Sequence, residues 1–88
     1  MLRAGEPWKA TARILVLYNP RGEWRYAVYS DVGVADGVLD DLPGSAAPEE
    51  AQAALLARVA DVTGHHYSAT WEVQEPHAWT ADLSMVDP

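Results

Sequence analysis

The hydrophobic and polar positions in the first third of the chain predict a β-hairpin. Two segments rich in strand-forming residues, 12–18 and 24–30, flank the turn 19–23, which reads NPRGE. Proline at the second position of this turn and glycine at the fourth are typical of a three-residue hairpin loop. If Asn19 lies opposite Glu23, cross-strand pairing places six apolar residues on one face. These six are Ile14, Val16, Tyr18, Trp24, Tyr26 and Val28.

The other face of this hairpin is mixed, because it carries Arg13 and Arg25 beside four apolar residues. Four of its residues have no covering element in the sequence, namely Leu15, Leu17, Ala27 and Tyr29. If a hairpin is apolar on both faces, either other elements pack on both faces or one face binds another protein. These four residues are therefore candidates for an interaction surface. Trp8 and Trp79 flank the domain, where they either cap the edges of the core or act as exposed anchors for a partner. We include Trp8 and Trp79 among the candidates for the interaction surface, because tryptophan is enriched at binding hot spots.

The pattern from Pro48 to Thr63 predicts an amphipathic helix. Proline suits the first helical turn, the two glutamates that follow it suit the positive end of the helix, and Gly64 marks the C-terminal stop. Apolar residues recur at helical spacing, which indicates a buried stripe. The stripe consists of Ala51, Leu55, Val59 and Val62.

The segments on either side of this helix predict two further strands. A short strand, Val38 to Asp40, is expected to end at Pro43 and Gly44, because proline cannot donate to a strand ladder. After the helix, apolar and polar residues alternate from Tyr67 to Val73, as in a half-buried strand. Residues 77–88 have no regular period, so we predict a flexible tail.

These elements predict one small domain that covers residues 1–88, with an ordered core of about residues 8–76. The predicted class is α+β, with an antiparallel sheet of three to four strands and one helix packed on one face. The predicted order of elements is β-β-(β)-α-β.

Composition narrows the possible partners. The 88 residues carry a formal net charge of −7 and no cysteine. Direct binding of nucleic acid is not expected, because phosphate contacts need clustered lysine and arginine. The lack of cysteine fits a reducing compartment, and no apolar run approaches a signal peptide or a membrane span. We therefore expect a cytoplasmic protein without a membrane partner, and the residue usage suggests a bacterial origin.

No residue cluster predicts catalysis, a cofactor or a metal site. His65 and His66 are adjacent, so on a strand they would point to opposite faces and could not ligate one metal together. The acidic residues between positions 31 and 41 do not follow the spacing of a calcium loop. No serine lies in a nucleophile elbow, and no glycine-rich phosphate loop is present. The expected function is therefore not enzymatic.

The stretch from Tyr26 to Ala51 resembles the HicB-like antitoxin domain. The likeness consists of a tyrosine-bearing strand, the turn ADGVL at 35–39, the sequence DLPG at 41–44 and the helix start EEA at 49–51. The family often carries a C-terminal DNA-binding segment, which this chain does not match, and it usually has another strand before the helix. The resemblance implies an antitoxin-like protein that masks a basic RNA-cleaving partner.

The sequence alone therefore predicts a small, acidic, non-catalytic protein-interaction module. We expect it to self-associate, as a homodimer, through the uncovered hairpin face, and to serve a regulatory role. The alternative that the resemblance adds is an antitoxin-like role toward a basic partner.

Overall fold

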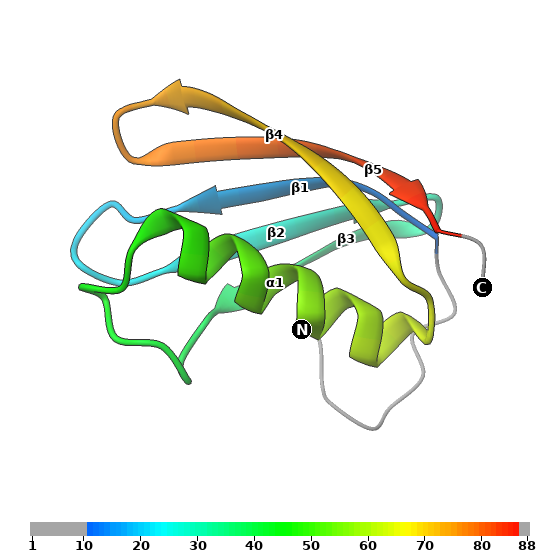
Figure 1. The fold of residues 1–88 in the computed structure, drawn as a ribbon, viewed down its shortest axis with the longest axis horizontal. Coiled ribbons are helices and arrows are strands. Elements are labelled where there is room, and N and C mark those ends of the chain that lie inside the picture. The colour runs from blue at the N-terminus through cyan, green and yellow to red at the C-terminus, as the bar shows by residue number, and fades with distance from the viewer. Residues whose placement is uncertain (1–10, 87–88) are drawn as a thin grey trace.

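Five strands and one helix make up the regular structure of residues 11–86, the part of the chain that the computed structural model describes. The strands are β1 (Ala12–Tyr18), β2 (Arg25–Ser30), β3 (Gly33–Val38), β4 (Tyr67–Glu75) and β5 (Ala78–Met85), and α1 (Pro48–Thr63) stands between β3 and β4. Every neighbouring pair of strands is antiparallel, in the spatial order β3-β2-β1-β5-β4. The helix lies across one face of the curved sheet (Figure 1). The predicted α+β class is confirmed. The predicted number of three to four strands, with one strand after the helix, is wrong, because the sheet has five strands and two of them, β4 and β5, follow the helix.

The helix matches its prediction because local sequence determines both of its ends. It runs from Pro48 to Thr63, and the side-chain carboxylate of Glu50 accepts a hydrogen bond from the backbone N–H of Ala47 at 3.4 Å. Gly64 ends the helix in a left-handed conformation, with φ of 74°, and its N–H donates to the carbonyl of Ala60 at 2.9 Å. Glycine adopts this conformation without the steric cost that a Cβ brings. All four residues of the predicted stripe are buried against the sheet: Ala51, Leu55, Val59 and Val62.

The pairing of β1 with β2 differs from the predicted register. Tyr18 lies opposite Arg25, Leu17 opposite Tyr26 and Leu15 opposite Val28. The connection therefore spans residues 19–24 instead of forming a three-residue loop. Successive strand residues alternate between faces, so this shift of one position moves the side chains of β1 to the opposite face from the one predicted.

Leu15 and Leu17 consequently lie in the hydrophobic core, and both side chains are 0% exposed. They pack on the helix side of the sheet with Tyr26 and Val28, which are also buried. The prediction that Leu15 and Leu17 face away from the core is wrong. Ile14, Val16 and Tyr18 take the outward positions instead.

The predicted tail contains a strand in the interior of the sheet. β5 pairs with β1 on one side, where Leu17 lies opposite Trp79, and with β4 on the other, where Trp71 lies opposite Ala81. Ala81 is buried. A flexible tail from residue 77 is therefore wrong for Ala78–Met85, because these residues complete the hydrogen bonding of β1.

The loop between β3 and α1 packs tightly against the β1–β2 connection. The side-chain amide of Asn19 donates to the carbonyl of Gly44 at 2.9 Å, and the indole N–H of Trp24 donates to the carbonyl of Ala46 at 3.1 Å. The carbonyl oxygen of Gly22 occupies the space that a Cβ on Gly44 would need. This close approach of two backbone segments explains the glycine of the DLPG sequence. The strand expected at Val38 to Asp40 is displaced, since β3 ends at Val38.

Candidate interaction surface

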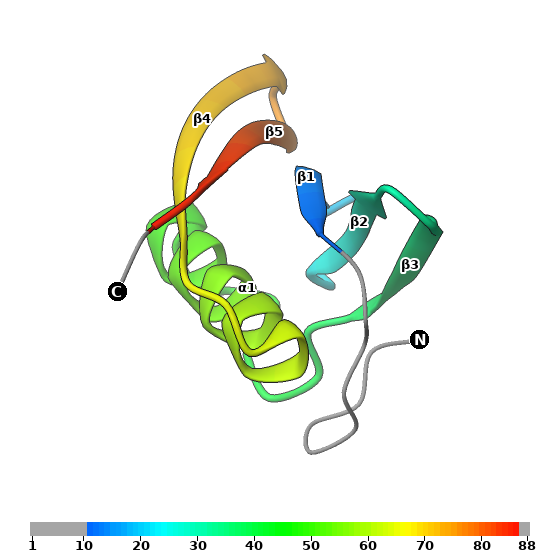
Figure 2. The ribbon, with the colours of Figure 1, turned by 90° about the vertical axis from the view of Figure 1, so that its right-hand side faces the viewer.

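The sheet has a second face, which points away from α1. No element of residues 11–86 covers it, since the only helix lies on the opposite side (Figure 2). We call it the outer face. Strand alternation and the pairing register place seven apolar residues of β1, β2 and β3 on it. These are Ile14, Val16, Tyr18, Ala27, Tyr29, Val34 and Val38.

One row of the outer face is the most exposed. Ile14 lies opposite Tyr29, and Tyr29 lies opposite Val34, so the three side chains stand side by side across β1, β2 and β3. Their exposed fractions are 41%, 44% and 57%. Val32, in the turn between β2 and β3, is 65% exposed. Contiguous exposed apolar surface of this kind is typical of an interaction site.

The other half of the outer face, on β5 and β4, is polar and acidic. Thr80 lies opposite Glu72, and Asp82 lies opposite Thr70. The sequence has no lysine or arginine after Arg58, so these carboxylates have no basic neighbour on their own strands. The outer face is thus divided into a mainly apolar half on β1–β3, which also carries Arg25 and Asp36, and an acidic half on β4–β5.

Arg25 is the basic residue within the apolar half. Its guanidinium forms an ion pair with the carboxylate of Glu23 at 2.7 Å. Hydrogen bonding to Tyr18, and then to Glu23, raises the pKa of Arg25 above its ordinary value. Glu23 therefore balances the charge of Arg25 locally.

The predicted surface residues fall into three groups. Ala27 and Tyr29 lie on the outer face, whereas Leu15 and Leu17 are core residues. Trp79 is half-buried on the helix side, where its ring centroid is 5.5 Å from that of Trp24, so it caps the core. Trp8 lies outside the described residues.

Sequence reasoning missed five outer-face residues, Ile14, Val16, Tyr18, Val34 and Val38. The first three belong to an apolar run, residues 14–18, in which neither set of alternate positions is polar. Such a run leaves the choice of face open, and the pairing decides it. Val34 was missed because the sequence around it, DVGVADG at 31–37, is rich in glycine and aspartate, which are typical of turns and not of strands.

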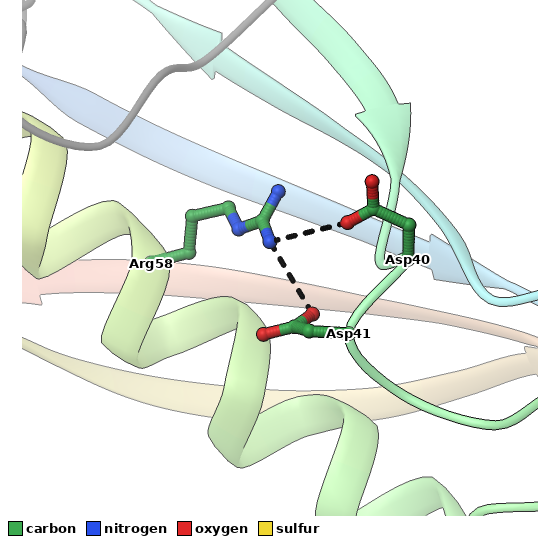
Figure 3. A network of polar contacts seen from close by, with 3 residues as sticks. All are labelled: Asp40, Asp41 and Arg58. Atoms are coloured by element: carbon green, nitrogen blue, oxygen red, sulfur yellow. Dashed lines mark hydrogen bonds and ion pairs between the residues drawn. The ribbon is translucent and has the colours of Figure 1, made fainter.

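The charged residues near the helix form a structural contact. Arg58 on α1 reaches Asp41 at 3.3 Å and Asp40 at 3.7 Å in the loop that follows β3 (Figure 3). The carboxylate side chains are 68% and 83% exposed, so the contact is worth at most about 1 kcal/mol. Within residues 11–86 no group of three or more histidine, cysteine or acidic side chains is arranged to hold a metal.

A shallow groove of about 670 Å³ runs along α1 beside the start of β4. Its described lining is mainly apolar, with Leu56, Ala57 and Ala60 from the helix and Tyr67 from β4. Asp61 and His66 also line it. No hydrogen bond joins these two side chains, and no serine lines the described part of the groove, so it does not present a nucleophile with a base.

No protein-family model, curated protein or solved structure matches the chain. The HicB-like resemblance of residues 26–51 therefore stays a prediction. In the part of the chain that the structure describes, no helix is both long and apolar enough to cross a membrane.

Proposed function

We propose that the chain is a non-catalytic protein-interaction module that self-associates through the apolar half of the outer face. The observation that carries this proposal is the row Ile14, Tyr29 and Val34, three large apolar side chains exposed side by side. A sheet face of this kind is normally covered by a second layer, which the described residues do not supply.

The size of this surface sets the strength of the association. Three strands at about 4.8 Å spacing, each about six residues long, give roughly 280 Å² of flat area. Stable interfaces bury about 800 Å² per partner. We therefore expect weak, reversible association that depends on protein concentration, and not a permanent dimer.

The test compares the wild-type protein with two glutamate variants by sedimentation velocity, from about 1 μM to 1 mM. Tyr29→Glu places a charge in the exposed row and should abolish concentration-dependent association. Thr80→Glu, the matched control in the acidic half of the same face, should reduce it much less. Circular dichroism must show that both variants keep the wild-type fold. Wild-type protein that stays monomeric over the whole range, or equal effects of the two variants, would overturn the proposal.

A further inference from the structure

The outer face carries carboxylates on both sides of its exposed apolar row. On one side, Asp36 lies on the edge strand β3. On the other side, Asp82 lies on β5, opposite Ile14, and Glu72 follows on β4. All three carboxylate side chains are exposed, and none of them forms an ion pair within residues 11–86. The exposed row is therefore bordered on both sides by negative charge.

The spacing of these carboxylates fits the width of an α-helix. From β3 to β5 there are three steps across the sheet, which make about 14 Å at about 4.8 Å per step. An α-helix with its side chains is about 10–12 Å in diameter, so one helix fits between Asp36 and Asp82. The strands β1–β3 are about 20 Å long, which matches roughly 13 helical residues at about 1.5 Å per residue.

The area and the charge of the outer face also favour a single basic helix. A helix about 11 Å wide and about 20 Å long covers roughly 220 Å², close to the roughly 280 Å² of β1–β3. A second copy brings its own net charge of −7 to the contact, whereas basic side chains are attracted by the carboxylates. Arg25 does not reverse this preference, because Glu23 already pairs with it at 2.7 Å.

We propose that the outer face binds a basic amphipathic α-helix of a partner protein, which lies along β1 and β2. The apolar stripe of this helix packs on the exposed row. Lysine or arginine residues on one flank reach Asp36, and those on the other flank reach Asp82 and Glu72. The bound helix adds a layer on the face opposite α1, so the sheet lies between two helices. This inference rests on the proposed function in so far as both place the contact on the exposed row.

A designed peptide is the probe for this inference. It has about 14 residues, with leucine at helical spacing on one side and lysine on both flanks, and it carries a fluorescent label. One control peptide has glutamate in place of lysine, and the other has the same composition in scrambled order. Binding to the wild-type protein is measured by fluorescence anisotropy at about 0.1 M and about 0.5 M salt. The basic amphipathic peptide should bind at least about 10-fold more tightly than either control, and high salt should weaken its binding.

Two double variants that remove equal charge locate the binding site. Asp82→Asn with Glu72→Gln should weaken binding by roughly 2- to 30-fold, since two exposed ion pairs are lost. Glu49→Gln with Asp61→Asn removes two exposed carboxylates from α1, on the opposite side of the sheet, and should leave binding almost unchanged. Tyr29→Thr should weaken binding by about 10-fold, because the centre of the exposed row is lost. Circular dichroism must show that these variants keep the wild-type fold.

The outcomes separate this inference from the function on which it rests. Equal binding of the basic peptide and either control peptide, or equal effects of the two double variants, would overturn the inference. Sedimentation velocity adds a second arm, because the basic peptide should reduce any self-association that uses the same row. Self-association that the peptide leaves unchanged would also overturn the inference, while the proposed function stands. Specific peptide binding to a strictly monomeric protein would support the inference and remove only the self-association.

Discussion

Gly44 gives the sharpest test of how the loop between β3 and α1 is held. The change is Gly44→Ala, which adds one methyl group. Gly44 does not have a positive φ, so its backbone conformation alone does not require glycine. If it served only as a turn residue, alanine would reduce the entropy of the unfolded chain and stabilise the protein by about 0.4–1 kcal/mol.

The structure predicts the opposite sign. The added Cβ would occupy the position of the Gly22 carbonyl oxygen, so the loop must move away from the β1–β2 connection. That movement breaks the hydrogen bonds from Asn19 to Gly44 and from Trp24 to Ala46. Each is worth about 0.5–1.5 kcal/mol, and the buried indole N–H left without a partner adds to the loss. We expect a destabilisation of roughly 2–4 kcal/mol.

The assay is urea unfolding followed by tryptophan fluorescence and far-UV circular dichroism. In thermal unfolding, the same loss should lower the Tm of a domain of this size by roughly 8–32 °C. Ser45→Ala, an exposed neighbour in the same loop, is the control and should change stability by less than about 0.5 kcal/mol. An unchanged or increased stability of Gly44→Ala would refute the close backbone contact as the reason for this glycine.

Three further substitutions test separate contacts by the same unfolding assay. Ala47 has the extended conformation of an N-cap but no side-chain acceptor, so Ala47→Asp should stabilise the protein by about 1 kcal/mol; no gain would contradict this capping argument. The Tyr67 hydroxyl accepts a hydrogen bond from the N–H of Ala12 at 3.2 Å in a buried position. Tyr67→Phe should therefore cost about 1–3 kcal/mol, and a neutral result would mean that water replaces the hydroxyl. Arg58→Ala should cost at most about 1 kcal/mol, and the ionic part of that cost should shrink in high salt. A cost that salt leaves unchanged would assign the effect to packing of the arginine stem instead.

The helix and β4 could be predicted from the sequence because their patterns are unambiguous. The helix has a proline at its start, a glycine at its end and one apolar stripe, and all of these appear in the structure as predicted. The strand expected from Tyr67 to Val73 is β4, which extends two residues further. Local chemistry and hydrophobic period agree in both elements, and this agreement makes a prediction safe.

The hairpin register could not be predicted because its decisive contacts are distant in sequence. Both sets of alternate residues in β1 are apolar, so burial alone does not select a face. Asn19 and Trp24 instead bind the backbone of residues 44–46, which draws both out of the hairpin ladder and lengthens the connection. The wrong register also made part of the predicted interaction surface wrong, because Leu15 and Leu17 of β1 lie on the core side of the sheet.

The strand β5 escaped prediction for a different reason. Its sequence, AWTADLSM, mixes small, polar and apolar residues without a clean period. Ala81 is buried as a small side chain opposite Leu15 on one side and Trp71 on the other. A small residue between two large ones carries little signal of its own in the sequence.

The position of β1 has a consequence for how the chain folds. The residue pairs that join β1 to β2 are 7 to 18 residues apart in sequence, but those that join β1 to its other neighbour, β5, are 60 to 68 residues apart. Closing so long a loop costs conformational entropy before the contacts between β1 and β5 can stabilise the chain, and this slows folding. The three-strand meander β1–β2–β3 can form early, but until residues 78–85 are in place it presents the bare edge of β1. A nascent or truncated chain therefore exposes a hydrophobic strand edge that the finished protein hides, and such an edge can pair with another chain and aggregate.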